Sequence, residues 1–431
     1  MDLPALSFRG RLSRAGFWWT SVLLAASAAL LTLLLAPLMG RAAALVVSPL
    51  FFWMLAAAAV QRLRDLGRTP WWLLAALIPV AGPLWLLWLL GFRPGLRHEA
   101  SGYLSVELSN AELVNDVTGL NPVQVASTIT PTCVEDIQRV LRTSTVPLSV
   151  GGGHFSMGGQ VASPGSLHLD LRKLNRILAI DAKARTAHVQ SGVRWCDLQA
   201  ALDPHDLSVK IMQTYANFTV GGALSVNCHG RYVGLGPLIL SVRAIRLVLA
   251  SGELVRATPD DNAELFYAAI GGYGALGVIV EAELSLAENT RVERQSHTLA
   301  SADYPAYFAK EIREDPKAVF HNADLYPGHF SRANAVTWRE TSRPPTVKRR
   351  LQPTSRFHVL SRYMLWAISE TVGGRWRREH LVDPLLFRSR PVHPRNYEAG
   401  YDVAELEPRS REHTTYVLQE YFIPVERFMT S

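Results

Sequence analysis

Three long uncharged stretches near the N-terminus constrain the fold of this chain more than any other feature. They cover residues 15–40, 42–61 and 69–92, and each contains at least 20 uncharged residues in a row. A helix of about 20 apolar residues is long enough to cross a lipid bilayer. We therefore expect N-terminal transmembrane helices in a domain at residues 1–95, with the lipid bilayer as a partner.

Positive charge is concentrated around these stretches. The first hundred residues hold 9 arginines and 3 acidic residues, a net charge of +6, so the other 331 residues contribute only +1 to the total of +7. Arginines that flank apolar segments are typical of the cytoplasmic ends of membrane helices. The basic excess is therefore attributed to membrane topology, and no nucleic acid is expected as a partner.

Two short motifs frame the apolar stretches. Residues 8–14 read F-R-G-R-L-S-R, and residues 62–68 read R-L-R-D-L-G-R, with Trp71 and Trp72 directly after. These motifs resemble a small bacterial inner-membrane family of unknown biochemical function, although Arg64 stands where that family usually has His. The resemblance implies a multi-pass protein of the cell inner membrane and implies no chemistry.

The cysteines narrow the class of protein further. Only Cys133, Cys196 and Cys228 are present, and none has C-x-x-C spacing. This excludes a disulfide scaffold and a zinc ribbon, and it fits a reducing compartment. We expect no metal site.

After a predicted linker at residues 96–110, the pattern changes to that of an α+β domain. Helical periodicity at residues 134–141 is followed by short apolar runs at 146–150 and 167–171, which have the character of strands. A glycine-rich turn, G-G-G-H at residues 151–154, comes directly after the first of these strands. Such a turn lets backbone N–H groups converge on an anion, so it is a candidate pyrophosphate site.

Two further glycine clusters follow. Residues 215–230 combine small residues with Gly221 and Gly222 and contain no Lys or Arg. The third cluster, at residues 271–277, formally satisfies the dinucleotide motif G-x-G-x-x-G. That motif must follow a strand and open a helix, whereas this cluster follows an expected helix at 263–270 and precedes an expected strand at 278–284. A Rossmann domain is therefore rejected.

The three clusters belong to a longer series of motifs: G-G-G-H, L-x-L-D-L-x-x-L, S-G-V-R-W-x-D-L, G-G-A-L-S-x-N-x-H-G and G-x-x-G-x-x-G-V-I. In this order they resemble the FAD-binding domain of the vanillyl-alcohol-oxidase (PCMH-type) flavoprotein family. The resemblance implies FAD as the cofactor and a two-subdomain α+β FAD-binding domain at residues 111–290. The cofactor-binding residues that it implies are Val150, Gly151, Gly152, Gly153, His154, Phe155, Ser156, Gln213, Thr219, Gly221, Gly222, Asn227, His229, Gly277, Val278 and Ile279.

His154 has two interpretations under this resemblance. Many members of the family with this motif carry a covalent bond from the histidine to the flavin, so FAD is expected either covalently bound through His154 or held by hydrogen bonds alone. The second tether, from cysteine, that berberine-bridge-type relatives carry is not expected, because Cys228 lies after the glycine pair and the tethering cysteine of those relatives lies before it.

Residues 291–431 are expected to form an α+β substrate-binding cap, which looks incomplete compared with the family. Helices are predicted at 304–314 and 359–371, and strands at 319–326 and 416–423. The catalytic residue is unknown from the sequence, and the acid/base candidates are His393, Tyr397, Glu398, Tyr401, Asp402, Glu420 and Tyr421.

A basic, aromatic segment at residues 348–378 has two interpretations. It holds eight Lys and Arg residues among aromatic and aliphatic ones, a composition typical of a segment that lies on a membrane surface. The alternative is a solvated cap helix with one apolar face on the core.

Together these patterns predict an FAD-dependent oxidoreductase that takes a hydride from a CH–OH carbon of a sugar, lactone or alcohol, including lipid-linked ones. Two alternatives stay open: a catalytically inactive flavin-binding membrane protein, and a nicotinamide-dependent flavin reductase. Because FAD is made in the cytoplasm and the thiols are unpaired, we expect the flavin domain on the cytoplasmic side, with the third apolar stretch broken near Pro79 and Pro83.

Overall fold

The computed structural model describes residues 14–39, 42–65, 112–353, 359–369, 371–403 and 415–428. The chain divides into two compact units, residues 1–107 and residues 108–431. The third apolar stretch and the predicted linker at 96–110 lie outside the described residues.

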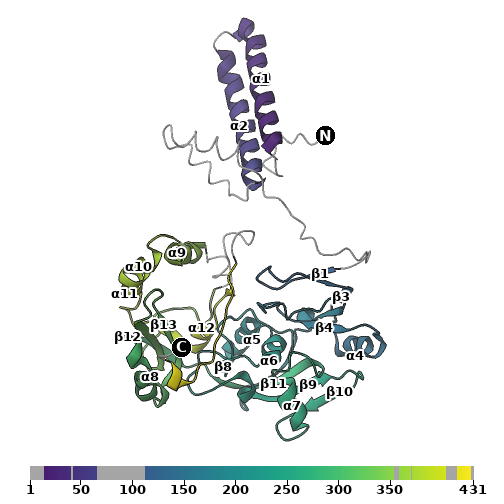
Figure 1. Ribbon diagram of the computed structural model, residues 1–431, viewed down its shortest axis with the longest axis vertical. Helices are drawn as coiled ribbons and strands as arrows, with labels where there is room; N and C mark the ends of the chain where they lie inside the picture. The colour runs from purple at the N-terminus through teal and green to yellow at the C-terminus, as the bar shows by residue number, and fades with distance from the viewer. Residues whose placement is uncertain are drawn as a thin grey trace. The chain divides into compact units, whose positions relative to one another are not determined.

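The first unit contains a pair of helices, α1 (Arg14–Met39) and α2 (Ala42–Asp65), which pack side by side along their lengths (Figure 1). Phe17 in α1 and Ala57 and Leu63 in α2 are buried. Arg62 is also fully buried, near the end of α2.

The predicted N-terminal transmembrane helices are contradicted by this unit. Among the residues that the structure describes, no helix is both long and apolar enough to cross a membrane. The prediction counted uncharged residues between arginines, whereas a crossing depends on the continuous apolar helix that they form. In α2 that helix contains Pro49 and ends in charged residues. The inner-membrane location and the lipid bilayer as a partner, which rested on these helices, stay predictions.

The second unit begins with a two-stranded antiparallel sheet, β1-β2, followed by a small parallel sheet in the order β3-β5-β4. The helix α4 packs on this sheet because its apolar positions recur at helical spacing, and Ile137 is fully buried against Leu169 and Val280. Acidic Glu135 and Asp136 occupy the first turn, where they stabilise the positive end of the helix dipole. The elements are β1 (Glu112–Val114), β2 (Val123–Val125), β3 (Ser127–Ile129), α4 (Val134–Thr143), β4 (Leu148–Gly151) and β5 (Leu167–Asp170).

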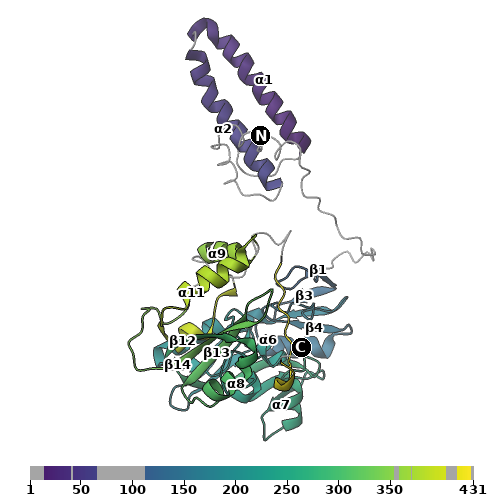
Figure 2. The ribbon, with the colours of Figure 1, turned by 60° about the vertical axis from the view of Figure 1, so that its left-hand side comes forward.

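A larger antiparallel sheet follows, in the order β10-β9-β11-β7-β6, with β8 pairing to β11. Helices lie against it (Figure 2), and Trp195, Leu198 and Leu247 are fully buried in the shared core. The elements are β6 (Ile177–Asp181), β7 (Thr186–Gln190), α5 (Trp195–Leu202), β8 (Leu207–Val209), α6 (Val220–Ser225), β9 (Val242–Val248), β10 (Leu254–Ala257), α7 (Ala263–Ala269) and β11 (Val278–Glu288).

The part of the second unit that follows β11, called the cap below, contains a four-stranded antiparallel sheet in the order β13-β14-β12-β15 and a set of short helices. Its elements are β12 (Arg291–Ala300), α8 (Tyr304–Tyr307), a π-helix (Phe308–Arg313), β13 (Ala318–Leu325), β14 (Arg332–Glu340), α9 (Val359–Ser369), α10 (Gly374–Arg377), a second π-helix (Arg378–Val382), α11 (Asp383–Leu386), β15 (Val392–Pro394) and α12 (Arg395–Ala399). Short 3₁₀ turns occur at Leu171–Lys173, Asp203–His205, Leu238–Ser241, Ser301–Asp303 and Val425–Arg427.

Most predicted elements are confirmed to within two or three residues, but the strand predicted at residues 416–423 is wrong. This segment has strand-like composition, yet it belongs to no strand of the structure. Tyr421 and Phe422 are 71% and 84% exposed. The apolar residues therefore do not alternate between a core and solvent, which is what a half-buried strand requires.

Candidate functional site

The first glycine turn lies directly at the end of β4, as its sequence position predicts. Gly151 is the last residue of the strand, and residues 152–156 form the loop that leaves it. Within the described part of the chain, no hydrogen bond engages the backbone N–H groups of residues 152–156. Five consecutive backbone N–H groups of this kind can bind an anion, because the glycines among them carry no side chain that would block its approach.

The second glycine cluster packs against this turn. Thr219 caps α6, and its Oγ1 accepts a hydrogen bond from Gly222 N at 3.3 Å. A Cβ atom built on Gly152 would lie only 2.3 Å from Thr219 Oγ1. Gly152 is thus required for the close approach of the two loops.

Aromatic stacking joins the loops a second time. The rings of Phe155 and Phe218 are stacked, with centroids 4.5 Å apart and an interplanar angle of 14°. The second loop is also tied to the chain before α5, because Gly221 N donates to Ser191 O at 2.7 Å. A Cβ on Gly221 would lie 2.6 Å from Ser191 Cβ, so this position too needs glycine.

His154 lies in the left-handed region, with φ of 59°, and faces His168 on β5. The two Nε2 atoms are 3.5 Å apart, at the long limit of a hydrogen bond. Ser166 Oγ donates to Ser163 O, so Ser149 Oγ donates to Ser166 Oγ and accepts from His168 Nδ1 at 3.0 Å. This arrangement leaves the lone pair of His168 Nε2 directed toward His154.

Burial lowers the pKa of both histidines. It lowers the pKa of His168 from 6.5 to about 4, with the neighbouring His154 as a further cause. The pKa of His154 is lowered as well, first by burial and then by the charge of Arg172. Both imidazoles are therefore neutral at pH 7, and they present a lone pair and an N–H rather than a cation.

Buried polar atoms behind the loops lack partners. Gln213 Oε1 accepts from Trp195 Nε1 at 2.9 Å and from the thiol of Cys228 at 3.1 Å. Gln213 Nε2 and Ser191 Oγ are buried and have no hydrogen-bond partner among the described residues. Donors of this kind are costly unless a ligand satisfies them.

The third glycine cluster contacts the end of α6. Gly271 N donates to Leu224 O and Tyr273 N donates to Ser225 O. Asn227 Oδ1 accepts from Ile239 N at 3.0 Å. The cluster connects α7 to β11, so the order of helix before strand is confirmed and the Rossmann interpretation stays rejected.

The last three predicted residues belong to the sheet. Gly277 has φ of 152°, and a Cβ there would lie 2.6 Å from Val248 O. Val278 and Ile279 begin β11 and are buried in the core. The structure thus places their side chains in the packing beneath the loops.

Four of the acid/base candidates are held in a buried cluster around Glu398, which is 1% exposed. Glu398 Oε1 pairs with Arg231 Nη1 at 3.0 Å and accepts from Tyr401 OH at 2.7 Å. His393 Nδ1 lies 3.3 Å from Glu398 Oε2, and the rings of His393 and Tyr397 are in edge contact. Burial, reinforced by Glu398, raises the pKa of Tyr401.

The other three candidates lie nearer the second loop. Asp402 Oδ1 accepts from Asn217 Nδ2 at 3.1 Å. Glu420 Oε2 is 3.3 Å from His229 Nε2, and both side chains are about half exposed. Tyr421, the third of these residues, is mostly exposed.

The C-terminal segment, residues 415–424, contacts residues next to the first loop and in the second. Leu418 N donates to Met157 Sδ at 3.0 Å, close after the first loop, and Thr415 Oγ1 donates to Thr118 O. Farther along, the ring of Phe422 meets His229 edge-on at 5.7 Å. In Figure 1 this segment, drawn in yellow, runs across the second unit.

Three residues of this site were missed by the sequence reasoning: His168, Ser191 and Arg231. The first two lie in the L-H-L-D-L and S-G-V-R-W motifs, so the sequence could have pointed to them. It could not show which residues they contact. No metal-binding group of side chains occurs within the described residues. The three cysteines are free thiols.

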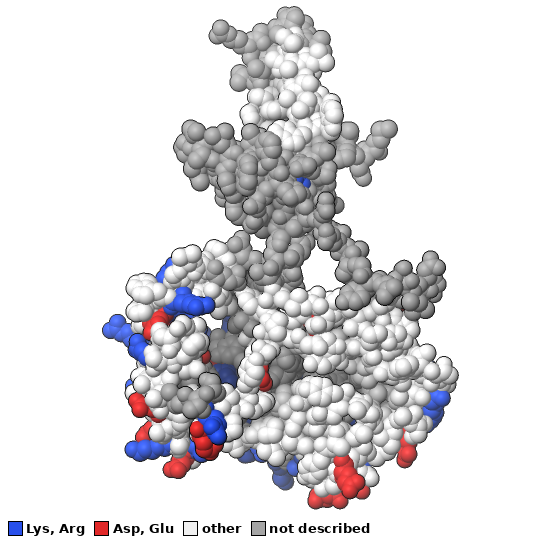
Figure 3. All heavy atoms as spheres, viewed as in Figure 1, with Lys and Arg blue, Asp and Glu red and all other residues white. Residues whose placement is uncertain are grey.

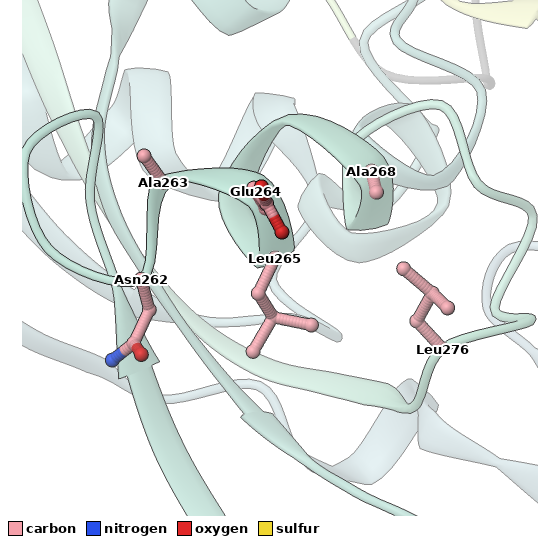
Figure 4. A pocket seen from close by; sticks show the side chains of 6 residues that line it. All are labelled: Asn262, Ala263, Glu264, Leu265, Ala268 and Leu276. Carbon is pink, nitrogen blue, oxygen red and sulfur yellow. The ribbon is translucent and has the colours of Figure 1, made fainter.

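A separate hollow lies along α7. It has a volume of about 580 Å³ and is lined by Asn262, Ala263, Glu264, Leu265, Ala268 and Leu276 (Figure 4). It contains none of the residues predicted to hold FAD.

The comparisons with known proteins bear on the two glycine loops. Residues 125–258, which include both loops, match the family model described as FAD binding domain. The chain carries an FAD-binding domain. Residues 5–101 match a second model, described as Protein of unknown function (DUF805).

Curated relatives of the FAD-binding domain are oxidoreductases by name. The chain is 30% identical over 216 residues to an uncharacterized oxidoreductase, ORF5 in the fasciation locus, of Rhodococcoides fascians, covering 49% of this chain and 48% of that protein. It is 26% identical over 224 residues to L-gulonolactone oxidase of Bos taurus, covering 50% and 49%. It is 35% identical over 133 residues to decaprenylphosphoryl-beta-D-ribose oxidase of Mycolicibacterium smegmatis, covering 30% and 29%. The chain thus spans about half or less of the length of these relatives.

The residues present fit the cofactor. Free N–H groups in the first loop suit the pyrophosphate of FAD, and the closeness of Gly152 to Thr219 keeps side chains out of that space. The unpartnered donors of Gln213 and Ser191 lie behind the second loop.

Proposed function

We propose that this protein is an FAD-dependent oxidoreductase that takes a hydride from a CH–OH carbon of a sugar, a lactone or a lipid-linked sugar. The observation that carries the proposal is the pair of loops, in which the N–H groups of residues 152–156 are free and Gly152 touches Thr219. The names of two relatives, L-gulonolactone oxidase and decaprenylphosphoryl-beta-D-ribose oxidase, support this substrate class.

The flavin supplies the hydride acceptor. The first loop binds the pyrophosphate through backbone N–H groups, and Gln213 and Ser191 satisfy their donors on the cofactor. Neutral His154, held at Nε2 by His168, either bonds covalently to the flavin or accepts a hydrogen bond from it. Val278 and Ile279 support the loops from the sheet.

Glu420 is the proton acceptor that we propose for the substrate hydroxyl. The candidates around Glu398 are bound to one another and buried, and Asp402 is engaged by Asn217. Glu420 keeps about half of its side chain exposed beside His229 of the second loop. Proton acceptance requires this access, since the base must come within hydrogen-bond distance of the substrate.

The test is anaerobic reduction of the purified, flavin-loaded protein. Absorbance in the flavin bands should fall when a sugar, a lactone or a polyprenyl-phosphate sugar is added. Glu420→Gln should keep its flavin and be reduced about 100-fold more slowly, in line with the usual contribution of a general base.

Acid precipitation of the same preparation distinguishes covalent from noncovalent binding of FAD. Flavin that stays with the precipitated peptide is covalently bound, and His154→Ala should then release it.

Other outcomes would overturn the proposal. Bleaching by NADPH and by no CH–OH compound would identify a nicotinamide-dependent flavin reductase. Bound flavin that no donor reduces would identify a catalytically inactive flavin-binding protein.

A further inference from the structure

The run of helix from α10 to α11 exposes a row of large apolar side chains. Val372, Trp376, Leu381 and Leu385 are 99%, 57%, 49% and 72% exposed. Trp376, Leu381 and Leu385 are spaced by five and four residues, which keeps them on one side of the helix, and Val372 lies in the turn just before α10 begins at Gly374. The step of five falls in the π-helix Arg378–Val382, whose hydrogen bonds reach one residue farther than those of an α-helix.

The opposite side of the same run is fixed to the cap. Gly374 is buried, and a Cβ there would lie 2.7 Å from Ile368 O. Arg378 Nη2 donates to Asp324 Oδ2 at 2.6 Å, and Asp383 is buried. The exposed row is therefore the outer face of a packed helix, which normally carries polar residues.

The charge around this row is positive and largely uncompensated. Residues 372–390 contain five arginines and two acidic residues, 5 − 2 = +3. Both acids are engaged, since Glu379 pairs with His329 and Arg332, and Asp383 with Arg378. Among the described residues, three exposed arginines of this segment form no ion pair: Arg375, Arg388 and Arg390. Figure 3 shows blue Lys and Arg atoms and a smaller group of red acidic atoms among white ones over the region of α10 and α11.

We propose that this α10–α11 surface, made of Val372, Trp376, Leu381 and Leu385 with Arg375, Arg388 and Arg390, docks on an anionic phospholipid surface. The apolar row enters the boundary between headgroups and acyl chains, while the arginines contact lipid phosphates. A lipid surface offers apolar and anionic groups in one layer, which matches a narrow apolar row bordered by cations. Docking of this kind requires no helix that crosses the membrane.

The experiment uses the full chain with vesicles of phosphatidylcholine alone or mixed with phosphatidylglycerol. Backbone hydrogen exchange should slow in residues 372–386 with the anionic vesicles only, and high salt should reduce the effect. Exchange is read peptide by peptide, so a contact made by residues 1–107 cannot be mistaken for one made here.

Variants assign the effect to this surface. Leu381→Ser with Leu385→Ser should remove the protection and weaken vesicle binding at least tenfold, as should Arg388→Gln with Arg390→Gln. Leu240→Ser is the matched control, because Leu240 is 64% exposed elsewhere on the domain. It should leave protection unchanged.

Two results would overturn the proposal. The first is vesicle binding with no change of exchange in residues 372–386. The second is slow exchange there without vesicles that depends on protein concentration, which would assign the surface to a second copy of the chain.

Discussion

His168 shows how one buried side chain can control a neighbour in the site. It is fully buried, and it receives its orientation from Ser149 through a hydrogen bond at Nδ1. Its other nitrogen faces His154. Replacing it would leave Ser149 and His154 without their shared neighbour, so His168 acts through His154 as a positioning residue.

The lowered pKa of His168 predicts a pH-dependent stability. Above pH 6.5 both folded and unfolded chains hold a neutral imidazole, and its contribution is fully present. As the pH falls from 6.5 to about 4, the unfolded chain binds a proton that the folded chain does not, so stability is lost. The loss should approach about 3 kcal/mol.

Urea unfolding between pH 7 and pH 4 measures this effect. His168→Gln should lose about 3 kcal/mol less than the wild type over that interval. The pKa of His321 is also lowered to about 4, but its pH-dependent contribution to stability is the same in both proteins and cancels in the difference between them. Exposed His205→Gln is the control. Parallel stability curves for His168→Gln and the wild type would contradict the prediction.

At the scale of elements, the two loops form the site only because they touch. The contact between Gly152 and Thr219 joins the end of β4 to the start of α6, and the stack of Phe155 on Phe218 supports it. A substitution that separates the loops should lower the affinity for flavin more than it lowers the stability of the sheets.

Gly152→Ala tests this contact. The added methyl group meets Thr219 Oγ1 at 2.3 Å, so the loops must separate, and we expect FAD affinity to fall at least tenfold, about 1.4 kcal/mol. Adding Thr219→Ala removes the clashing atom and should restore part of the affinity. Gly158→Ala is the matched control, since its methyl group would meet only the flexible end of Gln160. Equal flavin affinity for Gly152→Ala and the wild type, measured by titration, would contradict the prediction, because it would mean that the loops can accommodate the methyl group.

At the scale of the whole molecule, the two compact units predict separable functions. All residues proposed to hold FAD lie in residues 108–431, which have their own hydrophobic cores. A chain of residues 108–431 should therefore fold and bind FAD with an affinity within about threefold of the full chain, which corresponds to less than 1 kcal/mol. Flavin absorbance and calorimetry check this. A soluble, folded fragment that binds no FAD would mean that residues 1–107 complete the site.

The sequence by itself determined the local parts of this protein. The turn at residues 151–154 could be placed after a strand, and the third glycine cluster before a strand, because strand and turn preferences depend on neighbouring residues. The FAD-binding domain was recognised from the order of such motifs. Local patterns also misled: apolar composition suggested a strand at residues 416–423 and membrane-crossing helices near the N-terminus.

Only the tertiary structure decided which of these parts meet. His168 reaches His154 because β4 and β5 pair in parallel, and Glu398 reaches Arg231 across 167 residues of chain. The C-terminal segment contacts Met157 and His229 through a few isolated side chains, which leave no periodic pattern in the sequence. Alternation of apolar residues reports that a side chain is buried, but not against which partner, since any apolar surface satisfies the hydrophobic effect equally well.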